Sequence, residues 1–94
     1  MFLLNEVNEL YDAFSNKVSA PGNLDKKTKE LVAIACSVVA DCVPCIEWHY
    51  GQAIAAGANR EEIAEALAIA MSVAAGSKRA KYGPVIRKLE SEIK

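Results

Sequence analysis

Apolar residues recur every three or four positions along most of the chain, which is the spacing of a helix that buries one face. The first such segment spans about 2–18 and ends at Pro21-Gly22. A second begins after a cap at Asn23 or Asp25, and its residues 31–40 are apolar on nearly every side. We expect that part to be buried all round, with a neighbouring subunit as its second wall.

Three further helices are predicted. One spans about 41–57, and the next is capped at Asn59, with an acid three residues later, and ends before Gly76-Ser77. The last spans about 84–94, with Pro84 at the favourable first position. The expected buried stripe of the fourth helix is Ile63, Leu67, Met71 and Ala74. The pattern predicts an all-α fold, a compact bundle of about five to six helices forming one domain over residues 1–94.

The composition of the chain argues against several classes of function. The chain has 11 Lys and Arg against 12 Asp and Glu, for a formal net charge of −1. This balance argues against a nucleic-acid partner and leaves no polybasic patch for anionic lipid. With 52% hydrophobic residues the chain is not a disordered tail. A monomer of 94 residues would be marginally stable, so we expect a homo-oligomer.

The sequence also bears on location. Its longest apolar stretches are much shorter than the ~20 residues of a spanning helix, and we expect no membrane partner. The first residues carry no basic leader and soon reach Glu6 and Glu9, unlike a signal peptide. We therefore expect a cytoplasmic protein. Its cysteines would be reduced at rest there, and a Cys pair is then more often catalytic or metal-binding than a structural staple.

The stretch with the clearest chemistry is Cys42-Val43-Pro44-Cys45, followed by His49. A Cys-x-x-Cys at the start of a helix places two sulfurs within disulfide reach, at the positive end of the helix dipole. His49 lies one turn after Cys45 on the same face. Its imidazole can accept the thiol proton or stabilise the thiolate, so the three residues form a candidate redox site.

Two other interpretations start from the same residues. Cys42, Cys45 and His49 would supply three zinc ligands, but no residue clearly supplies the fourth, so we predict no metal. Cys36 lies in the apolar run and is expected in the core. Glu30 lies where a charged turn meets that run. A glutamate there is most often solvated, but one that points inward could orient or charge His49.

The spacing Glu30…Cys42-x-x-Cys45-x-x-x-His49, with 57–63 and 74–76 after it, resembles the alkyl hydroperoxidase D-like, carboxymuconolactone decarboxylase superfamily. The resemblance covers about residues 24–80. It implies a helical fold that assembles as trimers or hexamers, and a thiol-dependent peroxidase or disulfide reductase without metal or organic cofactor. By the same resemblance, Cys45 is the peroxide-reactive sulfur, Cys42 resolves it, and Glu30 and His49 form a proton relay.

The resemblance is not complete, and alternatives stay open. The chain has Pro44 where one branch of the family has a second histidine between the cysteines. The substrate would be a peroxide, and the reductant a thioredoxin-like or lipoyl-type dithiol. One alternative is a non-catalytic oligomeric binding module with a Cys/His metal site. Another is a lactone decarboxylase-like enzyme that uses Glu30 and His49 alone. The helix dipole favours Cys42 as the more acidic sulfur, whereas the imidazole favours Cys45.

Overall fold

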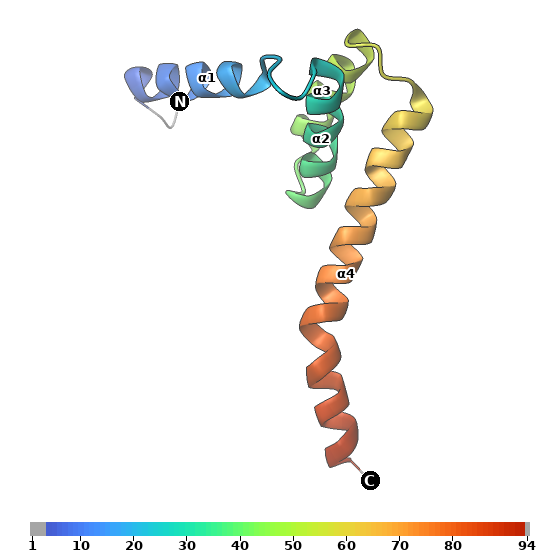
Figure 1. The fold of residues 1–94 in the computed structure, drawn as a ribbon. Helices are drawn as coiled ribbons and strands as arrows, with labels where there is room; N and C mark the ends of the chain where they lie inside the picture. The colour runs from blue at the N-terminus through green and yellow to red at the C-terminus, as the bar shows by residue number, and fades with distance from the viewer. Residues whose placement is uncertain (1–3, 94) are drawn as a thin grey trace.

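A computed structural model describes residues 4–93 and arranges them as four α-helices (Figure 1). No strand occurs in this part of the chain, so the predicted all-α class is confirmed. Phe2 and Leu3, which the sequence placed in the first helix, lie outside the described residues. The helices are α1 Asn5–Ser19, α2 Lys26–Val39, α3 Val43–Ala55 and α4 Arg60–Glu92.

Three of the helix starts are fixed by side-chain caps, because the first backbone amides of a helix have no partner within it. Asp25 accepts from the amide of Thr28 at 2.8 Å at the start of α2. The predicted capping box before α4 is confirmed: Asn59 and Glu62 each accept from the other's amide, at 2.8 and 2.9 Å. The start of α3 is capped by the sulfur of Cys42, as described below.

The core lies where α2, α3 and the first turns of α4 meet. Its centre is the fully buried Ile34, around which other buried apolar side chains pack. Val32 and Val39 on α2 are 50% and 55% exposed, so within one chain this helix is buried on one side only. The expectation that 31–40 is buried all round is therefore wrong for the single chain. The other buried members of the core are Ala53, Ala58 and Ile63, with Leu31, Ile46 and Leu67 partly buried against them.

Helix α4 corrects the predicted number of helices. It runs without a break through Gly76-Ser77 and Pro84, so the chain has four helices rather than five or six. A glycine costs only about 1 kcal/mol inside a helix, and residues 78–81, Lys-Arg-Ala-Lys, are strong helix formers. Pro84 follows Gly83, whose missing Cβ removes part of the clash that a proline makes with the residue before it.

The buried stripe of α4 also differs from the prediction. Ala70 is buried, whereas Met71, which was expected in the stripe, is 65% exposed. The buried face follows Ile63, Leu67 and Ala70, at the same spacing of three or four residues. An ion pair of 2.8 Å between Lys27 and Glu62 joins α2 to the start of α4 beside this face.

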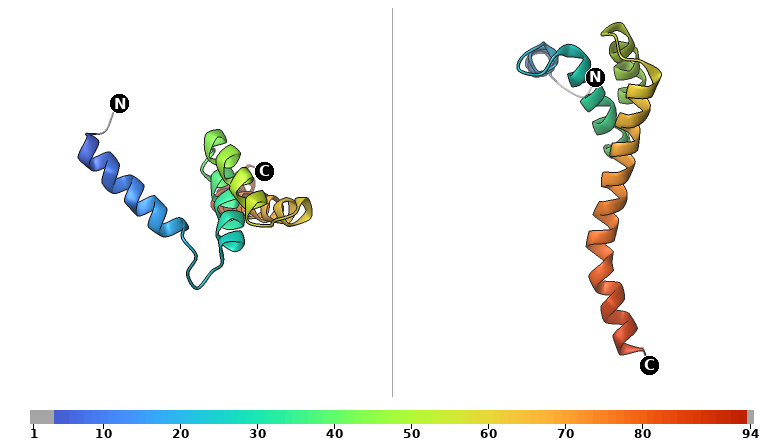
Figure 2. Two further views of the ribbon diagram at one scale, coloured as in Figure 1. Left: turned by 90° about the horizontal axis from the view of Figure 1, so that it is seen from above. Right: turned by 45° about the vertical axis from the view of Figure 1, so that its right-hand side comes forward.

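The chain is extended for its length. Its radius of gyration is 18.3 Å, against about 12 Å for a compact domain of this size. In Figures 1 and 2, α1 projects from one end of the α2–α3 pair, and the second half of α4 continues past it as a single helix. None of the α1 residues is buried. Among the described residues, no helix combines the length and apolarity that a membrane crossing requires.

The capping residue of α4 gives a first test. We expect Asn59→Ala to lower the free energy of unfolding by about 1 kcal/mol, because the amide of Glu62 loses its acceptor. Urea denaturation at fixed protein concentration measures the change. Ser77→Ala is the matched control, since Ser77 lies inside α4 and makes no cap. A loss of equal size in the control would contradict the continuous helix.

Candidate functional site

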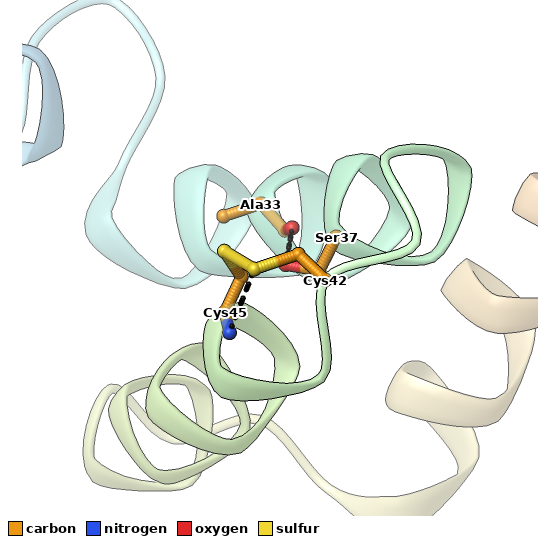
Figure 3. The surroundings of a disulfide bond; sticks show 4 residues. All are labelled: Ala33, Ser37, Cys42 and Cys45. Atoms are coloured by element: carbon orange, nitrogen blue, oxygen red, sulfur yellow. Dashed lines mark hydrogen bonds between the residues drawn. A yellow bond between two sulfur atoms is a disulfide. The ribbon is translucent and has the colours of Figure 1, made fainter.

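The turn between α2 and α3 places a pair of sulfurs at the start of α3. Asp41 adopts a positive φ of 55°, and the amide of Cys42 then donates to the carbonyl of Ser37 at 3.0 Å. Cys42 and Cys45 form a disulfide, with Cα atoms 5.2 Å apart. Figure 3 shows the disulfide beside Ala33 and Ser37 of α2. The turn and the first turn of α3 therefore hold the pair at disulfide distance.

Cys42 has a second role as the N-cap of α3. Its Sγ accepts a hydrogen bond from the amide of Cys45 at 3.2 Å. An amide at a helix N-terminus stabilises negative charge on the atom that it faces. When the pair is reduced, this contact favours a thiolate on Cys42. Pro44, in the first turn of α3, removes no helix hydrogen bond because amides there have no partner in the helix.

A buried carboxylate lies next to the histidine of α3. Glu30 is only 2% exposed, and its Oε2 lies 2.7 Å from Nδ1 of His49. Its other oxygen, Oε1, lies 2.9 Å from the ammonium of Lys26. Burial raises the pKa of the Glu30 carboxyl, but the hydrogen bonds and charges of Lys26 and His49 outweigh it and hold the pKa below its ordinary value.

This pairing determines which nitrogen of His49 is available. An ionised Glu30 can only accept, so Nδ1 of His49 carries a proton and donates it to Oε2. The other nitrogen, Nε2, is then free to accept a proton from a nearby acid. His49 is one helical turn from Cys45, as the sequence spacing requires. The structure thus brings Glu30 and His49 together and places the cysteine pair one turn away.

Sequence reasoning missed Lys26. It lies four residues before Glu30 on α2, a spacing at which helix side chains meet, and this was the available signal. Lys26 also donates to the carbonyl of Ser19 at 3.1 Å, at the end of α1. Lys29 donates to the carbonyls of Val18 and Ala20 at 2.8 and 2.6 Å. The two lysines bind carbonyls at the end of α1 and so connect it to the helix that carries Glu30.

An open groove of about 620 Å³ lies between α1, α2 and α3, and both Glu30 and His49 line it. Trp48, which is 64% exposed, forms part of its wall. Cys36 lies in the same groove with an exposed thiol, so the expectation that it is a core residue is wrong. The reason is that α2 is covered on one side only. The sequence pattern alone could not show which side of an apolar helix stays open.

The cysteine pair does not form part of a ligand set. Over residues 4–93, no three His, Cys, Asp or Glu side chains gather closely enough to hold a metal ion. The sulfurs of Cys42 and Cys45 are bonded to each other, and Nδ1 of His49 is bonded to Glu30. The arrangement instead suits reversible oxidation of a dithiol near a carboxylate–imidazole pair.

The family model of the carboxymuconolactone decarboxylase family matches residues 5–82 of the chain. The chain belongs to this family. The match includes the cysteine pair, Glu30 and His49, and it agrees with the resemblance found from the sequence.

The chain is similar to curated proteins from two bacteria. It is 41% identical over 71 residues to uncharacterized protein 4 in the cox locus of Paracoccus denitrificans, a match that covers 76% of this chain and 64% of that protein. It is 40% identical over 55 residues to an uncharacterized protein of Cupriavidus necator, covering 58% of this chain and 49% of that one. The matches therefore span 64% and 49% of the lengths of these relatives.

Solved structures of similar sequence share the fold. A protein from Methanobacterium thermoautotrophicum superposes with a TM-score of 0.82 at 35% identity, over 87% of this chain and 92% of that one. A carboxymuconolactone decarboxylase family protein from Thermotoga maritima gives 0.71 at 32% identity, over 96% and 99%. The Thermotoga protein is described as a candidate for involvement in an antioxidative response.

The ion-paired Glu30 predicts a pH dependence of stability. Its folded-state pKa lies below the ordinary 4.5, so its contribution is complete above 4.5 and is lost as the pH falls through the folded value. We expect Glu30→Gln to lower the free energy of unfolding by about 1–3 kcal/mol near pH 7, relative to the unchanged protein. The difference should shrink as the pH falls below 4.5 and Glu30 becomes protonated in the folded protein. Urea titrations at several pH values measure it.

Glu65→Gln is the control, because Glu65 is an exposed glutamate on α4. Its effect should be small and nearly independent of pH. A Glu30→Gln difference that stays constant or grows on acidification would show that Glu30 is not held ionised in the folded protein.

Proposed function

We propose that the protein is a dithiol oxidoreductase that reduces peroxides, or disulfides of a partner protein, through Cys42 and Cys45. The observation that carries this proposal is the Cys42–Cys45 disulfide at the start of α3, one turn before a histidine that is hydrogen-bonded to a buried glutamate. A thiol pair at a helix N-terminus is oxidised and reduced without a cofactor. The suggested antioxidative involvement of the Thermotoga relative supports the same class of chemistry.

In the first step Cys45 attacks the peroxide. His49 accepts the thiol proton at Nε2, while Glu30 stabilises the imidazolium through Nδ1. The Cys45 thiolate then attacks one oxygen of the O–O bond and becomes a sulfenic acid. The other oxygen leaves as an alkoxide or hydroxide and takes the proton from the imidazolium, giving an alcohol or water. The peroxide gains two electrons, and the sulfur loses two.

The second step closes the disulfide and the third reopens it. The thiolate of Cys42, held by the amide of Cys45, attacks the sulfenic sulfur, and the hydroxyl leaves as water with the proton that the Cys42 thiol released. A dithiol reductant, thioredoxin-like or lipoyl-type, then attacks Cys45 and displaces Cys42. The same amide stabilises Cys42 as the leaving thiolate. The reductant leaves as a disulfide, and the enzyme dithiol is restored.

This assignment gives the two sulfurs different tasks. Cys45 is the sulfur that meets outside molecules in both half-reactions, and the imidazole of His49 serves it. Cys42 is the sulfur that attacks Cys45 and leaves from it, and the helix N-terminus serves it. The helix dipole, which favours a thiolate on Cys42, and the imidazole, which favours one on Cys45, therefore each serve a different cysteine.

The reductant can be identified directly. We expect steady consumption of hydrogen peroxide or an alkyl hydroperoxide with one of dithiothreitol, dihydrolipoamide or thioredoxin, each supplied separately. Peroxide loss is followed with time. Alkylation of the reduced cysteines in the Cys36→Ser protein should abolish it. Turnover of a lactone that survives alkylation would instead favour a decarboxylase that uses Glu30 and His49 alone.

The roles of the cysteines give a separate test. We expect Cys42→Ser and Cys45→Ser each to reduce turnover below detection, because neither variant can close the disulfide. After one equivalent of peroxide, only Cys42→Ser should accumulate a sulfenic acid, detected by mass after trapping with dimedone. Cys36→Ser is the matched control and should keep most of the activity. A sulfenic acid on Cys42 in Cys45→Ser alone would reverse the two roles.

A further inference from the structure

The ammonium group of Lys26 contacts two acceptors from different parts of the fold. Its Nζ lies 2.9 Å from Oε1 of Glu30 and 3.1 Å from the carbonyl oxygen of Ser19, at the end of α1. Glu30 lies four residues further along the same helix, where side chains meet across one turn. The positive charge of Lys26 is therefore held against the buried carboxylate by contacts with two helices.

The two oxygens of the Glu30 carboxylate have partners of different kinds. Oε1 faces the ammonium of Lys26, which is a permanent positive charge near neutral pH. Oε2 faces Nδ1 of His49, a residue whose ring can be neutral or positive. Burial raises the pKa of the Glu30 carboxyl, and of the two partners that lower it Lys26 has the larger effect. Lys26 thus balances the carboxylate whether or not the imidazole carries a second proton.

No other lysine or arginine in residues 4–93 forms an ion pair with Glu30. Lys29 lies on the same helix and lines the same groove. Its ammonium, however, donates to two carbonyls at the end of α1, at 2.8 and 2.6 Å. Lys26 and Lys29 therefore both bind the end of α1, but only Lys26 also binds the carboxylate.

The other charged and titratable groups around this site supply no second counter-charge. Between α2 and α4, Lys27 and Glu62 balance each other at 2.8 Å. On α3, the exposed Glu47 lies two residues before His49 and so on the other side of that helix. The groove residues from α1 are uncharged, and the groove contains one further titratable side chain, Cys36. The buried carboxylate thus has one permanent counter-charge.

A permanent counter-charge changes how firmly the imidazole holds a proton. With Lys26 present, the ammonium and the carboxylate cancel, and the ring of His49 can stay neutral. Without Lys26, the charge of Glu30 would be buried and unbalanced unless the imidazole took up a proton. The uncompensated carboxylate would then hold that proton on the ring.

We propose that Lys26 is a positioning residue of the proton relay, whose ammonium keeps His49 neutral in the resting protein by balancing the charge of Glu30. This inference rests on the function proposed above, in which Nε2 of His49 accepts the thiol proton of Cys45 and then gives it to the leaving oxygen. Both transfers need a ring that is neutral before the reaction and releases its proton afterwards. Lys26 acts on the ring through Glu30 and does not act on the reacting atoms.

Nuclear magnetic resonance tests this role without any measurement of activity. His49 is the only histidine, so one set of ring signals reports on it. The oxidised protein is used in a Cys36→Ser background, in which no thiol titrates. We expect Lys26→Met to raise the pH at the midpoint of the ring titration by about one to two units, because the imidazolium becomes the only counter-charge of Glu30. An unchanged midpoint would overturn the proposal.

Two further variants separate the charge of Lys26 from its contact with α1. Lys29→Met is the matched control, since Lys29 also binds the end of α1 but forms no ion pair with Glu30. It should leave the midpoint in place, and Lys26→Arg, which keeps the charge, should do the same. An equal shift in Lys29→Met would mean that the position of α1 decides the protonation of His49, and the proposal would be wrong. Circular dichroism checks that each variant is helical.

The protein with Lys26 in place gives a measurement that does not depend on the folding of Lys26→Met. At about pH 8, we expect the nitrogen chemical shifts of a neutral His49 ring with its proton on Nδ1. A ring that is protonated on both nitrogens at this pH would contradict the proposal, because Lys26 would then not keep it neutral.

Turnover distinguishes the role of Lys26 from the function on which it rests. Near pH 7 we expect Lys26→Met to lower the rate of peroxide or disulfide reduction about tenfold, and Lys26→Arg to keep most of it. Turnover without the shift in the ring titration, or the shift with full turnover, would overturn the role of Lys26 and leave the proposed function standing. The shift in a protein without any turnover would overturn the proposed function, although Lys26 would still set the charge of His49.

Discussion

The ionised carboxylate of Glu30 is the constraint on which the site depends. A charge that is 98% removed from solvent is costly unless it is paired, and Lys26 and His49 supply the two partners. Each partner also has a second task. Lys26 binds the end of α1, and His49 directs its free nitrogen away from Glu30. One buried charge therefore connects α1, α2 and α3 and sets the tautomer of the only histidine.

The sulfur pair is organised by a different interaction, a hydrogen bond from one of the backbone amides at the start of α3 that have no partner within the helix. Cys42 is at once a helix cap and half of the disulfide, so the local structure that begins the helix also stabilises charge on the sulfur. The cap orients Cys42, and the helix repeat places His49 one turn from Cys45. The redox pair and the carboxylate–imidazole pair are thus built separately and meet on α3.

Because the core of the chain is small, many of its apolar side chains lie on the surface. Only the α2–α3 contact and the first turns of α4 enclose fully buried side chains, and many of the remaining large apolar residues lie on α1 and the second half of α4, which project from this centre. Such large exposed apolar faces are unusual on a protein that acts alone. They explain how a chain of 94 residues with a modest core can still carry 52% hydrophobic residues.

The sequence alone determined the helical class, the cap at Asn59, and the spacing of the cysteine pair and His49, because these follow from contacts within four residues. It left the cap of α2 open between Asn23 and Asp25, and the structure decided for Asp25. It overestimated the breaking effect of Gly76 and Pro84, whose local penalties a long helix absorbs. Only the tertiary structure decided that Glu30 faces His49 across 19 residues, that Lys26 joins them, and that Cys36 lies in an open groove. Those facts depend on which side of α2 is covered by other helices, and an apolar pattern on nearly every side of a helix cannot specify that.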